Sequence, residues 1–174
     1  MSLLDLLRSR AAQPSAAGDT DTVRRIVGEL DKLDGARARY LAAFAYVLSR
    51  VAGADLDISD VETAEMVRLV ERVGHLPEAQ AIVVVEIAKS QNRMFGGTEN
   101  FLVTREFREI ASAEQRRELL ECVFAVAAAD QAITGEEEAQ LWQIASELGF
   151  RHEEYVQVRL KYSDKRTVFR RPSS

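Results

Sequence analysis

The fold of this chain is decided by two stretches, VAGADLDISDVETAEMVRLVERVG at residues 51–74 and VAAADQAITGEEEAQLWQIASELG at residues 126–149. A shift of 75 residues aligns them without a gap. Because one offset brings all the matching positions together, the sequence predicts an internal repeat. Under this offset Ala52, Ala54, Asp55, Ile58, Glu62, Ala64 and Gly74 fall on Ala127, Ala129, Asp130, Ile133, Glu137, Ala139 and Gly149.

The apolar spacing within the repeat is helical. Each copy predicts a helix pair whose second helix ends at a glycine, Gly74 or Gly149, in the C′ position. A single helix pair cannot bury its apolar face, so the two copies are expected to pack together around a pseudo-two-fold axis. The i, i+3, i+4, i+7 stripe of Met66, Leu69, Val70 and Val73 corresponds to Leu141, Ile144, Ala145 and Leu148.

The same spacing predicts helices in the rest of the chain, so the fold class is an all-α helical bundle. Residues 22–33, 101–110 and 153–162 carry helical stripes, and Pro77 suits the first turn of a helix. With only 9 Gly and 3 Pro, the chain has too few turn residues for a sheet sandwich. We expect a flexible segment at residues 1–20, one helical domain at 21–163 and a basic tail at 164–174.

Composition excludes several classes of function. The 174 residues carry a net charge of −5, which disfavours nucleic-acid binding over the whole surface. The single Cys122 and two histidines exclude an intramolecular disulfide and make a Cys/His zinc site implausible. The single cysteine and the composition lead us to expect a reduced, cytoplasmic protein. No apolar run is long enough to cross a membrane. Cys122 is expected to be a buried, inert thiol, and Trp142 and Phe150 to belong to the core.

The repeated loops carry a family resemblance. Ala-x-Ala-Asp-x-x-Ile-[Ser/Thr]-x-x-Glu occurs at residues 52–62 and 127–137. This pattern resembles the TerB family, the tellurite-resistance protein B-like proteins, over about residues 40–163. The resemblance implies a bundle of helical repeats found in bacterial stress-response systems. It also implies that acidic loop residues bind divalent metal ions, and no enzymatic activity is established for the family.

From the residues alone, the end of each loop has a structural explanation. Ser59 and Thr134 suit the N-cap position, and Glu62 and Glu137 lie three residues later, where they would complete capping boxes. The isoleucine before each cap would pack back onto the core as a hydrophobic staple. Capping therefore accounts for every residue of the pattern after its aspartate.

The aspartates themselves favour a second interpretation. Asp55 and Asp130 follow predicted helices, where the negative end of the helix dipole disfavours an anion by about 0.3–1 kcal/mol. Local N–H groups would offset that cost through an Asx-type turn, and so would a bound cation. Each aspartate precedes its glutamate by seven residues, close enough for both to reach one ion. Carboxylate ligands favour Ca²⁺ or Mg²⁺, and the candidate ligands are Asp55, Asp57, Glu62, Asp130 and Glu137.

These loops are not EF-hands. The sixth position counted from Asp55 is Asp60 instead of Gly, and the twelfth is Met66, which offers no carboxylate. Ala132 stands at the second ligand position of the other copy. Any bound cation would therefore have a different geometry, completed by water or by a partner.

The sequence leaves two functions open. The first is a non-enzymatic TerB-like accessory protein that binds divalent cations in a stress-response assembly. The alternative is a metal-independent protein–protein interaction module in which the acidic loop residues only cap helices. The chain contains none of the common sequence motifs for nucleophilic, metallohydrolase or nucleotide chemistry. We expect other proteins as partners, and homo-oligomerisation stays open.

Overall fold

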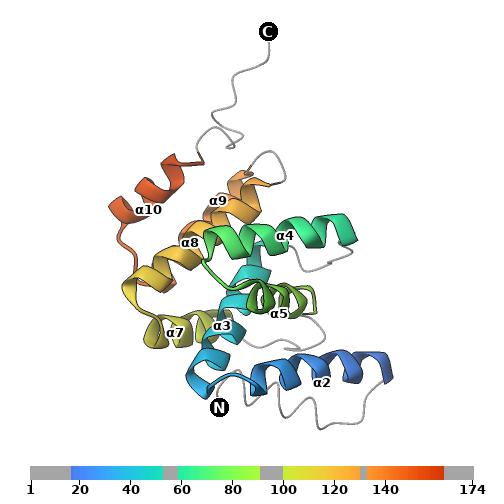
Figure 1. The fold of residues 1–174 in the computed structure, drawn as a ribbon. Coiled ribbons are helices and arrows are strands. Elements are labelled where there is room, and N and C mark those ends of the chain that lie inside the picture. Colours follow the sequence, from blue (N-terminus) through green and yellow to red (C-terminus); the bar gives the residue numbers. More distant parts are fainter. Residues whose placement is uncertain (1–16, 53–58, 91–99, 130–132, 163–174) are drawn as a thin grey trace.

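The protein is a bundle of helices. The computed structural model describes residues 17–52, 59–90, 100–129 and 133–162, and within these ranges it holds eight α-helices and no strand, which confirms the all-α prediction (Figure 1). The two chain ends and the Gly96-Gly97 pair lie outside the described residues. The helices are α2 (Ala17–Asp31), α3 (Gly35–Ala52), α4 (Asp60–Val73), α5 (Glu78–Lys89), α7 (Asn100–Ile110), α8 (Ala113–Ala128), α9 (Gly135–Glu147) and α10 (His152–Leu160).

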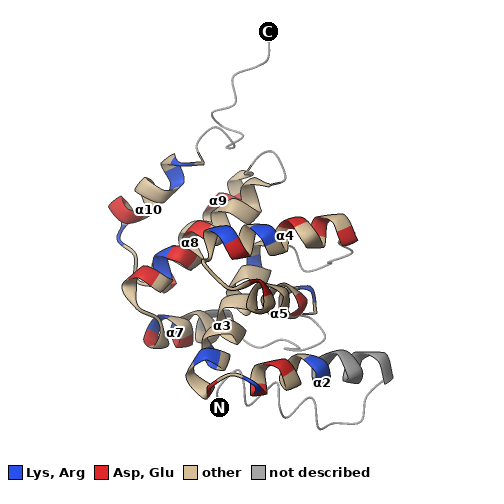
Figure 2. Ribbon diagram, in the orientation of Figure 1, with Lys and Arg blue, Asp and Glu red and all other residues tan. Residues whose placement is uncertain are grey.

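Helix α3 lies at the centre of the bundle. Every residue from Tyr40 to Ser49 is buried, so this helix has no solvent-exposed face over nearly three turns. A helix that is apolar all round must be enclosed by others. Accordingly α3 contacts α2, α5, α7, α8 and α9. Figure 2 shows the consequence for charge: Lys, Arg, Asp and Glu lie along α4 and in the first half of α8, whereas the middle of α3 carries none.

Two aromatic clusters contribute to the core. Tyr40 and Phe44 of α3 pack against Phe107 of α7, with ring centroids 5.3 and 6.2 Å from that of Phe107. Phe124 of α8 stacks on Tyr162 at 5.7 Å and contacts Tyr155 at 5.6 Å. The first cluster joins α3 to α7, and the second joins α8 to α10.

The ends of α4 and α9 differ. Gly149 has φ +89°, and the N–H groups of Gly149 and Phe150 donate to Ser146 and Ala145, which makes a Schellman motif and confirms Gly149 as the C′ residue. The same prediction for Gly74 is wrong. Gly74 is the C-cap with φ −79°, and the left-handed residue is His75 with φ +53°. A Cβ on Gly74 would lie 2.6 Å from the Val70 carbonyl oxygen, so glycine is needed there for close approach.

Two further differences from the sequence predictions concern single residues. Pro77 is the N-cap of α5, one residue before the first turn in which it was expected, because its ψ of 149° is extended. Trp142 is 36% exposed, so its predicted place in the core is wrong. Its ring lies at the surface, edge-on to His152 and Tyr155 at centroid distances of 5.2 and 5.0 Å. Phe150 does pack against the core.

The helix positions agree with the 75-residue offset but do not establish duplication. Helix α4 begins at Asp60 and α9 at Gly135, which are 75 residues apart. Helix α3 contacts α8, and the contact of α4 with α8 has a counterpart in the contact of α9 with α3. Similar capping sequences would by themselves start the two helices at matching positions. The internal repeat and its pseudo-two-fold axis therefore stay predictions.

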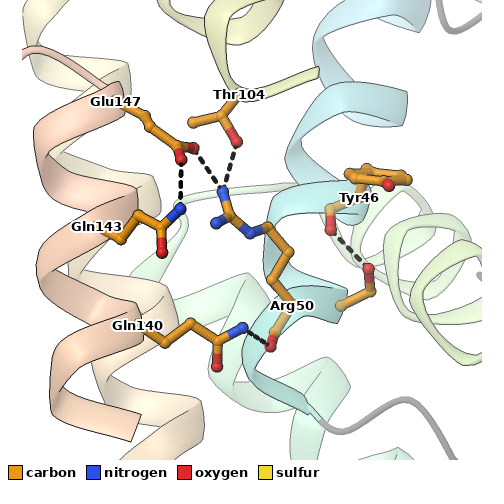
Figure 3. Close-up of polar contacts among 7 residues, drawn as sticks. Tyr46, Arg50, Thr104, Gln140, Gln143 and Glu147 are labelled. Atoms are coloured by element: carbon orange, nitrogen blue, oxygen red, sulfur yellow. Dashed lines mark hydrogen bonds and ion pairs between the residues drawn. The ribbon is translucent and has the colours of Figure 1, made fainter. Parts of the chain in front are cut away.

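A buried ion pair joins α3 to α9. Nη1 of Arg50 donates to Glu147 Oε2 at 2.6 Å and to Thr104 Oγ1 of α7 at 2.9 Å (Figure 3). Only 4% of the Arg50 side chain and 9% of the Glu147 side chain are exposed. Gln143 donates to the second oxygen of Glu147, and Gln140 donates to the Arg50 carbonyl oxygen. Three helices are thereby held in register by one guanidinium group.

Replacing Glu147 by alanine should destabilise the fold strongly. The change leaves the Arg50 guanidinium buried without a carboxylate, which costs about 3–5 kcal/mol in other buried pairs. Urea denaturation followed by circular dichroism measures the effect. Glu109→Ala is the control, because Glu109 pairs with Arg105 at 3.5 Å with both side chains more than half exposed, and such pairs contribute about 0–1 kcal/mol. Equal losses for both variants would contradict the structural role of the buried pair.

Candidate functional site

A capping box closes the start of α4. The Glu62 N–H donates to Ser59 Oγ at 3.3 Å, and Glu62 Oε2 accepts from the Ser59 backbone N–H and hydroxyl, both at 2.8 Å. Thr63 adds a hydrogen bond from its hydroxyl to the Ser59 carbonyl oxygen at 3.0 Å. Two N–H groups that a helix start leaves without partners are satisfied in this way. The predicted cap is confirmed.

The start of α9 repeats this arrangement. The Thr134 N–H donates to Glu137 Oε2 at 2.7 Å, and the Glu137 N–H donates to Thr134 Oγ1 at 3.2 Å. Ile133, directly before the cap, is buried, as expected of a hydrophobic staple. Both predicted glutamates therefore occupy the same position relative to their loops.

The other predicted ligands lie outside the described residues. These are Asp55 and Asp57 in the loop between α3 and α4, and Asp130 in the loop between α8 and α9. Their approach to Glu62 and Glu137 stays a prediction. Within the ranges that the structure describes, no group of three or more His, Cys, Asp or Glu side chains is arranged to hold a metal ion.

The Glu62 carboxylate is stabilised in its ionised form. Its pKa is lowered, chiefly by the hydrogen bond from the Ser59 backbone N–H and next by that from the Ser59 hydroxyl. Hydrogen bonds donated to a carboxylate favour the charged state over the protonated one. Glu62 therefore carries a negative charge in the first turn of α4, where it interacts favourably with the positive end of the helix dipole.

Each helix start is also held by a cation from a later helix, which the sequence did not reveal. Lys89 of α5 donates to the Thr63 hydroxyl at 3.0 Å. Arg159 of α10 pairs with Glu138 at 3.4 Å, and the Tyr155 hydroxyl donates to the Glu138 carbonyl oxygen. These contacts span more than fifteen residues of chain, so no local pattern could indicate them.

The comparison with known families matches residues 40–160, from α3 to the end of α10 and across both capping boxes, to the family described as Tellurite resistance protein TerB. The chain belongs to the TerB family. The matched range agrees closely with the resemblance found in the sequence. No curated protein and no solved structure matches the chain.

The region matched to the TerB family includes both capping boxes, and the match names no substrate. The matched region contains the buried Arg50–Glu147 pair and the Tyr40–Phe44–Phe107 cluster, whereas α2 precedes it and Tyr162 follows it. In the part of the chain that the structure describes, no helix has the length and apolar character needed to span a membrane.

The cysteine and the two histidines occupy positions in which their contacts are structural. Burial raises the pKa of the Cys122 thiol to about 12, so it stays protonated and unreactive near neutral pH, as predicted. His75 lies at the surface, with Nδ1 2.9 Å from Glu118 Oε1. His152 is also exposed and contacts Trp142 by its ring edge.

Stability at acid pH should depend on Glu62. Because its pKa is lowered in the folded state, its stabilisation is fully present above the ordinary glutamate pKa and is lost as the pH falls through the lowered value. Glu62→Gln keeps a hydrogen-bonding capping side chain but removes this titration. The variant should therefore lose less stability than the unmodified protein between about pH 6 and about pH 3. Urea denaturation at several pH values measures this, and Glu65→Gln, at an exposed position of the same helix, is the control.

Proposed function

We propose that this TerB-family protein is a non-enzymatic accessory protein that binds divalent cations through its two interhelical loops. The observation that carries the proposal is the capping box at the end of both loops, which fixes a glutamate carboxylate close in sequence to Asp55 and Asp57 in one loop and to Asp130 in the other. A carboxylate that is already held in place loses little conformational entropy when it binds an ion.

The chemistry of the proposed sites follows from their oxygen ligands. The proposed ligands are Glu62, Asp55 and Asp57 for a cation at the first loop, and Glu137 and Asp130 for a cation at the second. In both capping boxes the contacts to the cap use Oε2 of the glutamate, so Oε1 is the oxygen proposed to face the ion. Hard carboxylate oxygens select Ca²⁺ or Mg²⁺ over zinc or copper, with water completing the coordination.

The wider role proposed for the protein is in a cytoplasmic bacterial stress-response assembly of the tellurite-resistance type. Its support is the family match over residues 40–160. The protein would then sense or buffer the concentration of divalent ions for its protein partners and would catalyse no reaction.

One observation favours a second candidate function. Both capping boxes are complete with protein groups alone, so Glu62 and Glu137 have a structural use that needs no ion. In this alternative the protein is a metal-independent interaction module of the TerB family, and its partners bind elsewhere on the helices.

Calorimetric titration separates the two candidates. The metal-stripped protein should bind Ca²⁺ saturably, and the double variant Asp55→Asn with Asp130→Asn should lose this binding while its helical circular dichroism is retained. Asn keeps the shape and hydrogen bonding of Asp but lacks the charge that a hard cation needs. Glu114→Gln with Glu153→Gln removes two charges from the first turns of α8 and α10 and should bind as before. A flat titration of the unmodified protein with both Ca²⁺ and Mg²⁺ would refute cation binding.

Partner retention tests the second candidate. If the loops only cap helices, proteins that co-purify with the tagged chain should be retained equally with and without chelator. The Asp55→Asn, Asp130→Asn variant should retain them as well. Release of the same partners by chelator, and their recovery on adding Ca²⁺, would instead support the cation-dependent assembly.

A further inference from the structure

A cleft of about 410 Å³ lies between α4 and α8, next to the end of α10. Both walls present residues spaced i, i+3, i+4, which is the spacing of a ridge that a third helix can pack against. We call it the α4–α8 cleft. It is lined by Leu69, Arg72 and Val73 from α4, by Ala125 and Ala128 from α8 with Ala129 directly after it, and by Lys161 and Tyr162, which follow α10.

The corresponding interface in the other half of the bundle is filled. Under the 75-residue offset, the pair α8 and α4 corresponds to α3 and α9. There the Arg50 side chain extends from α3 to Glu147 of α9. Helix α7 contacts both helices and supplies Thr104 to the same guanidinium group. A third helix thus covers the α3–α9 interface.

The α4–α8 cleft is open for two reasons. Ala125 stands at the position that corresponds to Arg50, so no long side chain crosses from α8 to α4. Helix α2, which precedes α3 as α7 precedes α8, packs against α5 and α3 (Figure 1). In the described structure, the cleft keeps apolar surface from Leu69 and Val73, both of which are only partly buried.

The charge beside the cleft indicates the chemistry of its occupant. Arg72 is exposed, and no carboxylate of the described residues forms an ion pair with it. It stands where Glu147 stands in the other half. Lys161, at the end of the cleft, is paired with Glu121 of α8. An acidic group in the cleft would therefore form an ion pair with Arg72, as Glu147 does with Arg50.

We propose that the α4–α8 cleft docks an amphipathic helix of a partner protein, with apolar residues against Leu69 and Val73 and an acidic residue against Arg72. The chain's own tail is a poor occupant, because its basic residues Lys165, Arg166, Arg170 and Arg171 have the same charge as Arg72 and Lys161. None of the described residues that line the cleft is a carboxylate, so peptide binding there is expected without added cations.

A charge-swap experiment tests the proposal with a defined probe. The probe is a labelled synthetic helix of roughly 14 residues with leucines at i, i+3, i+4 and i+7 and glutamates beside them, and its twin carries lysines instead. Fluorescence anisotropy measures binding to the full chain in the presence of chelator. The glutamate peptide should bind about tenfold more tightly than the lysine peptide, and Arg72→Glu should reverse this preference.

A cleft-filling variant locates the binding. Ala129→Leu places a larger side chain in the cleft from an exposed position at the end of α8. It should lower the affinity for the glutamate peptide about tenfold. Ala139→Leu, at an exposed position of α9, is the matched control and should bind as the unmodified chain does. Unchanged circular dichroism shows that each variant is folded.

Several results would overturn the proposal. Absence of binding by either peptide, or a preference that Arg72→Glu does not alter, excludes an acidic helix. Stronger peptide binding by a Val168→Ala, Phe169→Ala chain would show that the tail occupies the cleft. Conversion of a dimer to a monomer by Ala129→Leu in analytical ultracentrifugation would assign the cleft to a second copy of the chain.

Discussion

The burial of α3 on all sides is the constraint on which the rest of the structure depends. Its residues from Tyr40 to Ser49 expose almost nothing to solvent, so helices from both halves of the chain must surround it. The last turn of this helix carries a single charge into the interior, that of Arg50. Because an isolated buried charge is very costly, Glu147 and Thr104 must meet it, and this fixes α9 and α7 against α3.

This framework positions the two acidic loops. The loop after α3 ends at the Ser59–Glu62 capping box, and the loop after α8 ends at the Thr134–Glu137 box. Each loop thus connects a buried helix to a helix start with a fixed carboxylate. The proposed cation sites and the alternative capping role concern the same glutamates, Glu62 and Glu137, and both lie within the matched residues 40–160.

The two halves share their helix starts but differ in how their interfaces are completed. Arg50 and Glu147 fill one interface, whereas Ala125 and Arg72 leave the corresponding one open. The ends of α4 and α9 differ as well, because the left-handed residue is His75 in one and Gly149 in the other. One interface is thus closed by a buried ion pair, whereas the other keeps a cleft at the surface.

The sequence by itself determined the helices, the capping boxes of α4 and α9 and the family, because these depend on residues within one or two turns of each other. Apolar spacing predicted α4 and α9, and Ser-x-x-Glu and Thr-x-x-Glu predicted their capping boxes. Only the tertiary structure decided that Trp142 lies at the surface, that Arg50 pairs with Glu147 across 97 positions, and that Lys89 supports the start of α4. These outcomes depend on which helices pack against each other around α3. The local sequence of a helix does not specify which of its faces this packing leaves exposed.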